Sequence, residues 1–204
     1  MQVISSLLKL QSYHIEDPAL KVIFKDTENR IKSMALVHER LYRTEDLAHI
    51  DFGDYIRNLA VDIFHSFGAN ASHVRLHVDA EDITLPIDTA IPCGLIINEL
   101  ITNALKYAFP FVQGQDRPGD RKGELVIEMK RREQEKASLV TGHWSIELVV
   151  RDNGIGIPED LDFKTAHSLG LNLVTSLAKQ IRGEIELNRE GGTEWRIRFG
   201  EKSQ

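Results

Sequence analysis

Four short motifs occur in one order along the second half of this chain, and they constrain its fold more than any other feature. The first is Glu99 with Asn103 in an otherwise apolar run, and the others lie at 151–157, 168–173 and 191–193. Each motif is weak alone, because Asp-Asn-Gly or Gly-Gly is also an ordinary turn signal. Together, their order predicts that distant segments meet around one ligand.

Glu99 and Asn103 are four residues apart, so on a helix they project from the same face. Both offer hard oxygen donors, which suit a Mg²⁺ that also binds phosphate oxygens. We therefore predict that both are catalytic residues and metal ligands, with Glu99 orienting or deprotonating a water. An exposed polar helix face is the competing interpretation, but aliphatic residues flank the pair on both sides. Lys106 is expected to reach phosphate from the next turn, and Tyr107 to pack near a base.

The segment after residues 146–150 combines a carboxylate with two glycines, Asp152-Asn-Gly154-Ile-Gly156. A carboxylate accepts a hydrogen bond from the exocyclic amine of adenine and repels the carbonyl of guanine. Glycine lets the backbone come close to a flat ring. The sequence thus predicts an adenine site that coincides with a turn after a strand.

Gly170 stands where a helix is expected to begin, and helix N-termini present free N–H groups to phosphate. An ordinary loop-to-helix junction explains Gly170 equally well. Thr193 is expected to bring a hydroxyl near Asp152, although a hairpin turn by itself accounts for the two glycines before it. The chain contains neither a P-loop motif nor a complete dinucleotide-binding fingerprint. The predicted ligands are ATP and Mg²⁺.

Composition narrows the possible partners and the compartment. The net charge of −6 argues against a nucleic-acid-binding surface. The single cysteine, Cys93, lies in an apolar helical stretch, so it predicts a buried, inert thiol and a reducing, cytoplasmic compartment. No apolar run approaches the length of a membrane span, so no membrane contact is expected.

The hydrophobic pattern divides the chain into two domains, at 1–46 and 47–204. In the first, apolar residues recur every three or four positions on both sides of a break at 14–17, which predicts an antiparallel helical hairpin. Its apolar stripe is too large to bury alone, so a homodimer is expected. In the second domain, helices and strands alternate irregularly, which favours an α/β sandwich with helices on one face of a mixed sheet. Helices are expected from Asp51, around Glu99 and at 169–181, and strands at 74–78, 83–85, 124–131, 144–151, 184–189 and 194–199.

The four motifs resemble those of the GHKL ATP-binding superfamily, and within it the sensor histidine kinases of two-component signalling. The segment Glu99–Tyr107 resembles the N box, 152–156 the first glycine box, Gly170-Leu171-x-Leu173 the second and 191–193 the last. The resemblance implies a Bergerat-type ATP-binding fold in which Leu171 also contacts nucleotide. The runs at 2–8 and 34–42 resemble the dimerisation hairpin of the branch related to the HWE kinases.

The resemblance implies that, in the intact parent, a histidine attacks the γ-phosphate of ATP and the phosphoryl group passes to an aspartate of a response regulator. In that branch the phosphoacceptor segment comes just before the Leu-Gln-Val-Ile-Ser-Ser run, whereas this sequence starts at Met1-Gln2. We therefore expect a kinase core that binds Mg²⁺ and ATP without phosphorylating itself at the usual histidine.

Two other classes remain open from the sequence. One is a GHKL-type ATPase in which Glu99 activates water, and it predicts appreciable ATP turnover. The other is a dimerising nucleotide-binding module without catalysis, and it predicts weak or absent binding of an ATP analogue.

Overall fold

The structure is a computed structural model that describes residues 50–68, 73–80, 83–110, 123–132, 146–158 and 169–200, with a few isolated positions between 10 and 31. The predicted hairpin at 1–46, apart from those positions, lies outside the described residues. So do residues 111–122 and 159–168.

A five-stranded mixed sheet forms one layer of the described part, in the spatial order β2-β4-β5-β7-β6. The first pair, β2 and β4, is parallel, and each of the other neighbouring pairs is antiparallel. A separate two-stranded sheet joins β1 to β3. The strands are β1 (Ile50–Asp51), β2 (Val74–Ala80), β3 (Thr84–Leu85), β4 (Gly123–Arg131), β5 (Ile146–Asp152), β6 (Glu184–Asn188) and β7 (Thr193–Phe199).

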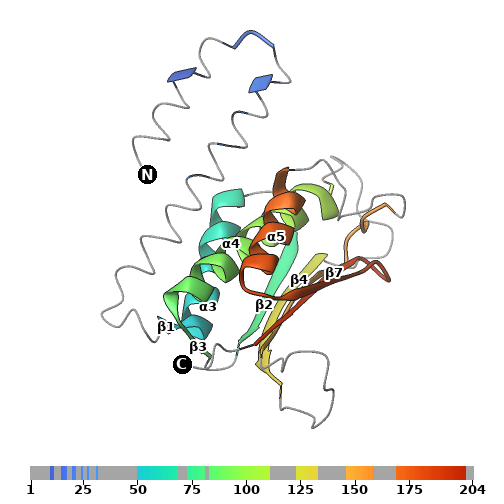
Figure 1. Ribbon diagram of the computed structural model, residues 1–204. Helices are drawn as coiled ribbons and strands as arrows, with labels where there is room; N and C mark the ends of the chain where they lie inside the picture. Colours follow the sequence, from blue (N-terminus) through green and yellow to red (C-terminus); the bar gives the residue numbers. More distant parts are fainter. Residues whose placement is uncertain are drawn as a thin grey trace.

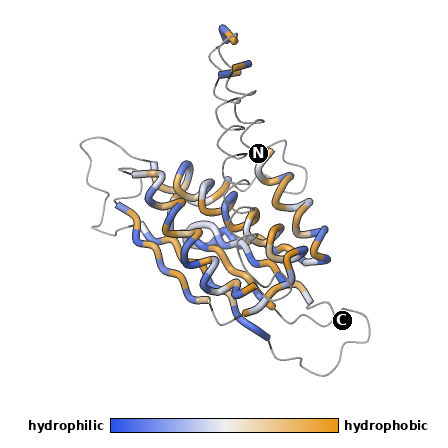
Figure 2. Tube along the Cα trace, turned by 90° about the vertical axis from the view of Figure 1, so that its left-hand side faces the viewer, coloured by the Kyte–Doolittle hydropathy of each residue, from blue (hydrophilic) through white to orange (hydrophobic). Residues whose placement is uncertain are grey.

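Three helices lie together on one face of this sheet, with α4 between α3 and α5 (Figure 1). Helix α3 (Phe52–Phe67) begins where the Asp51 carboxylate accepts the Asp54 N–H at 3.0 Å, a side-chain cap on an otherwise unpaired donor. It ends at Gly68, whose φ of +51° suits glycine. Each helix carries apolar residues on its sheet-facing side, and Figure 2 shows the resulting mixture of hydrophobic and hydrophilic positions.

Helix α4 (Ile87–Asn103) continues directly into a π-helical turn, η2 (Ala104–Ala108), and α5 (Leu169–Gln180) packs beside α4. A π-turn widens the helix by one residue per turn and is often found at functional sites. Both the end of α4 and the start of α5 lie over the same end of the sheet.

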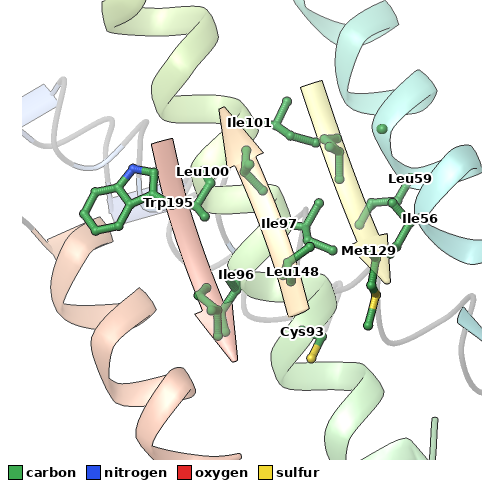
Figure 3. Close-up of a cluster of buried hydrophobic side chains, with 14 of the residues drawn as sticks. Ile56, Leu59, Cys93, Ile96, Ile97, Leu100, Ile101, Met129, Leu148 and Trp195 are labelled. Atoms are coloured by element: carbon green, nitrogen blue, oxygen red, sulfur yellow. The ribbon is translucent and has the colours of Figure 1, made fainter. Parts of the chain in front are cut away.

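The core fills the space between the helices and the sheet (Figure 3). The strands contribute alternate residues, as in β4, where Leu125, Ile127 and Met129 are fully buried and the residues between them are half-buried. Cys93 on α4 is fully buried here as predicted, and burial raises the pKa of its thiol. It is therefore a packing residue.

The opposite face of the sheet is covered by ion pairs. Glu147 on β5 is nearly buried and pairs with Arg132, Arg196 and Arg198, the last at 2.9 Å. Burial raises the pKa of Glu147, but the hydrogen bonds from Arg132 and Arg198 lower it below the usual value. The described residues therefore form a two-layer α/β sandwich, with the helices on one face of the sheet and these charged side chains on the other.

The predicted fold class is confirmed: α/β with helices on one face of a mixed sheet. The predicted strands and helices of the second domain occur within two residues of their expected bounds. The short strand β1 and the π-helical geometry of η2 are not predicted from the sequence, because neither a two-residue strand nor a single widened turn leaves a visible periodicity.

Candidate functional site

Residues from four segments meet at one end of the sheet around a cavity of about 440 Å³. The cavity lies between the end of α4, the turn after β5, the start of α5 and the start of β7. Seven predicted site residues line it: Asn103, Tyr107, Asp152, Gly156, Gly170, Leu171 and Thr193. Distant parts of the sequence thus form one pocket.

Asp152 and Thr193 form the polar end of the cavity. They are the last residue of β5 and the first of β7, and they stand directly opposite each other in the antiparallel pair. The backbone N–H and the hydroxyl of Thr193 both hydrogen-bond to the Asp152 carboxylate, as does the Gly154 N–H at 2.8 Å. Burial raises the pKa of Asp152 above its usual value, and these hydrogen bonds oppose the rise.

The turn after β5 is held on two sides by hydrogen bonds. The side chain of Asn153 accepts the Glu124 N–H at 2.7 Å, and the Asn153 N–H donates to the Glu124 carbonyl at 3.2 Å. The Ile155 N–H donates to the carbonyl of Ala108 at the end of η2, at 3.0 Å. Asp152 is therefore held at a fixed position relative to both β4 and η2.

Gly154 lies against η2, outside the lining of the cavity. A Cβ placed on Gly154 would meet the Ala108 carbonyl oxygen and lie 2.5 Å from the Ala108 Cβ, far inside contact distance. This glycine is needed for the approach of the turn to η2, a different reason from the predicted approach to a ring. Gly156 does line the cavity, and its φ of +77° is a conformation that glycine favours.

Helix α4 and η2 supply the other wall. Asn103 is half-buried and lines the cavity, and Tyr107 lines it with 62% of its surface exposed. Lys106 is half-buried and is absent from the lining. Glu99 is 2% exposed and also lies outside the lining, one turn before Asn103. Of the predicted pair, Asn103 therefore lies in the cavity wall and Glu99 lies in the core.

Gly170 and Leu171 lie in the first turn of α5, and both are buried and line the cavity. The helix therefore presents its N-terminal end to the pocket, where backbone N–H groups are not paired within the helix.

Most of the cavity lining is apolar, and most of these residues are not predicted from the motifs. The largest of them is Trp195, which is 5% exposed and lies two residues after Thr193 on the same face of β7. Period-two alternation along β7 is a signal that could have identified it. The other missed lining residues are Leu100, Ala104, Ala108, Val150, Ile155, Ile157 and Pro158.

The lining decides what the cavity can hold. Among the described residues that line it, Asp152 is the single charged side chain, and the remainder is mostly apolar. Such a cavity suits a flat, weakly polar ring with one hydrogen-bond donor, and it is a poor place for a triphosphate. Within the described ranges, no group of three His, Cys, Asp or Glu residues could hold a metal ion by itself.

Comparison with known families agrees with this geometry. Residues 88–203 match the family model described as histidine kinase-, DNA gyrase B-, and HSP90-like ATPase. The chain belongs to this ATPase family. Residues 1–67 match a second model, described as histidine kinase. The resemblance to sensor histidine kinases is thereby confirmed.

Curated relatives of this chain are histidine kinases. The chain is 28% identical over 201 residues to blue-light-activated histidine kinase 2 of Erythrobacter litoralis, which covers 95% of this chain and 51% of the relative. It is 24% identical over 197 residues to sensor histidine kinase PdtaS of Mycobacterium tuberculosis, which covers 95% of this chain and 36% of that protein. The chain thus spans about half the length of the first relative and about a third of the second.

A solved structure supports the fold assignment. The histidine kinase domain of the blue-light activated histidine kinase EL346 from Erythrobacter litoralis superposes with a TM-score of 0.66 over 98% of this chain and 95% of that domain. Its sequence is 24% identical, so the likeness concerns the fold. Among the described helices of this chain, none combines the length and the hydrophobicity that a membrane span requires.

The contact between Gly154 and η2 gives a first testable prediction. In Gly154→Ala the new methyl group would push the turn away from Ala108 and so displace Asp152. Overpacking of this kind costs about 1–3 kcal/mol, so the melting temperature should fall and binding of an ATP analogue should weaken. Thermal unfolding and calorimetric titration measure the two effects.

Gly68→Ala is the matched control. Unlike Gly154, Gly68 has a positive φ and open space around the position of a Cβ, and it is absent from the cavity lining. The Gly68→Ala variant should be less stable than wild type and should bind the ATP analogue with unchanged affinity. Equal nucleotide affinity in both variants would contradict the role given to Gly154.

Proposed function

We propose that this chain is the ATP-binding catalytic core of a sensor histidine kinase of a two-component system. In the whole protein, the γ-phosphate of ATP would pass to a histidine and then to an aspartate on the receiver domain of a response regulator. The observation that carries the proposal is the single cavity in which Asp152, at the end of β5, faces Asn103, at the end of α4.

Asp152 is the residue proposed to select adenine. Its carboxylate lies at the polar end of an otherwise mostly apolar cavity and is held by Thr193 and Gly154. A fixed carboxylate accepts a hydrogen bond from the adenine amine and repels the carbonyl that guanine has in its place. The apolar lining would pack against the ring, and exposed Tyr107 would cover its outer side.

Asn103 and the N-terminus of α5 are the groups proposed to face the phosphates. The described lining has no positive charge, so the triphosphate has to extend toward the mouth of the cavity, where a helix N-terminus favours anions. The donor set fits a Mg²⁺ that arrives with the nucleotide, because Asn103 offers an amide oxygen and the described residues form no metal site alone. When bound, Mg²⁺ neutralises phosphate charge during transfer.

Glu99 is proposed to orient Asn103 and the surrounding groups from one helical turn away. Since Glu99 is 2% exposed and outside the cavity lining, it is poorly placed to deprotonate a water beside the γ-phosphate. This burial favours the kinase over the ATPase in which Glu99 is the base. Lys106 remains a proposed phosphate contact from η2.

The remaining assignments are also proposals. Residues 1–46 would form the dimerisation hairpin and 47–204 the catalytic domain. The histidine kinase model matches residues 1–67, which include the proposed hairpin and extend through α3. A homodimer and a cytoplasmic location follow from the same assignment.

Asp152→Asn tests the adenine site. A hydrogen bond to a charged group contributes about 1.5–3 kcal/mol, so affinity for a non-hydrolysable ATP analogue should fall about tenfold to a hundredfold. Affinity for the guanine analogue should stay the same or rise, because the new amide can donate to a carbonyl. Both affinities are measured by calorimetry, with Asp79→Asn on the outer sheet face as the control.

The same titration has a defined pH dependence. Because burial raises the pKa of Asp152, the carboxylate takes up its proton at a higher pH than an ordinary aspartate does. Affinity for the ATP analogue should therefore be highest at neutral pH and fall as the pH drops. The fall should begin at a higher pH than it would if Asp152 had an ordinary pKa. Asp152→Asn should abolish this dependence, and a variant that kept both selectivity and pH profile would contradict the assignment.

Asn103→Ala tests the metal position. Wild type should bind the ATP analogue more tightly with Mg²⁺ than without, and the variant should lose most of that difference because an oxygen ligand is gone. Asn103→Asp should retain it. Asn58→Ala on α3 is the matched control, since Asn58 is a surface amide bonded to its own helix. An unchanged Mg²⁺ effect in Asn103→Ala would count against this position.

A further inference from the structure

Trp195 is the largest side chain in the cavity wall. It lies on β7, pairs with Val150 on β5 and with Leu187 on β6, and is 5% exposed. Figure 3 shows its indole at the end of the buried cluster, beside the Leu100 side chain of α4. The indole therefore belongs both to the hydrophobic core and to the wall of the pocket.

The strand register places Trp195 one step deeper than the polar end of the cavity. Asp152 pairs with Thr193, and the next inward-facing pair on the same two strands is Val150 with Trp195. Two residues along a strand advance about 6.6 Å, so this second pair forms the wall immediately beyond the carboxylate.

We propose that Trp195 sets the depth of the base pocket and excludes purine nucleotides whose exocyclic amine carries a substituent. The proposal rests on the proposed function, in which that amine donates to Asp152. A group attached to the amine has to extend past the carboxylate, toward the Val150–Trp195 pair. The space it would need is filled by the indole.

The two exposed apolar side chains of the wall are less able to exclude such a group. Tyr107 and Ile155 also line the cavity, but they are 62% and 72% exposed, so they can turn into solvent and make room. Trp195 has no such freedom, because it is buried between neighbouring strands and close-packed interiors leave little space for another rotamer. Val150 is buried too, but it is a much smaller side chain.

The size of the effect follows from how apolar pockets discriminate. One methylene too many in a rigid apolar pocket changes affinity about 10-fold to 200-fold. A benzyl group on the amine is larger, so wild type should bind an N6-benzyl ATP analogue at least tenfold more weakly than the unsubstituted analogue.

The experiment compares two ligands on four proteins. The ligands are a non-hydrolysable ATP analogue and its N6-benzyl derivative, titrated by calorimetry against wild type, Trp195→Leu, Trp195→Phe and Leu187→Ala. Leu187 is the matched control, because it packs beside Trp195 from β6 but is absent from the cavity lining. Trp195→Phe keeps an aromatic ring in the core and serves if Trp195→Leu does not fold.

The expected result is a change of preference. Trp195→Leu should bind the N6-benzyl analogue at least tenfold more tightly than wild type does, Trp195→Phe should show a smaller gain, and Leu187→Ala should keep the wild-type preference. Suppose that wild type binds the unsubstituted analogue, but that neither Trp195 variant binds the benzyl analogue more tightly than wild type does. That result would overturn the role of Trp195 and leave the proposed function standing. Wild type that binds neither analogue would overturn the proposed function and this inference with it.

Discussion

The pairing of β5 with β7 is the constraint on which the rest of the site depends. It sets Asp152 opposite Thr193 at the end of the inner sheet face and continues inward with apolar pairs beneath α4. A shift by one residue would turn Asp152 to the opposite face, because side chains alternate along a strand. The outer face favours the same register, since Glu147 on β5 stands opposite Arg198 on β7 and pairs with it at 2.9 Å. Apolar packing on the inner face and ion pairing on the outer face thus favour the same strand register, and this register fixes the position of the Asp152 carboxylate.

Much of this arrangement could be predicted from the sequence because it depends on local periodicity. The alternation in β4 and β7 and the capping residue Asp51 predict two strands and the start of α3. The four motifs predict that distant segments meet around one ligand. The position of Glu99 could not be predicted from spacing alone. Four residues turn a helix by about 400°, so Glu99 is rotated about 40° from Asn103, enough to place it in the core. The role of Gly154 also depends on a tertiary contact, with η2, that no local pattern reveals.

The cavity separates the tasks of binding a base and handling phosphate. Its described lining is mostly apolar with one carboxylate, so the part of the ligand held inside is best a ring. The polar groups proposed for phosphate chemistry, Asn103 and the start of α5, border that ring pocket. The ATPase family includes proteins of different activities, and one fold can serve several of them. Buried Glu99 and the match of residues 1–67 are the two features that favour phosphoryl transfer to a histidine over hydrolysis.

The most direct test of the central claim is a crystal structure of the chain with Mg²⁺ and a non-hydrolysable ATP analogue. The account predicts the adenine amine within hydrogen-bond distance of the Asp152 carboxylate, the ring against Trp195 and Val150, and the metal and phosphates beside Asn103. A nucleotide bound elsewhere, or one in this cavity with its base turned away from Asp152, would contradict the account.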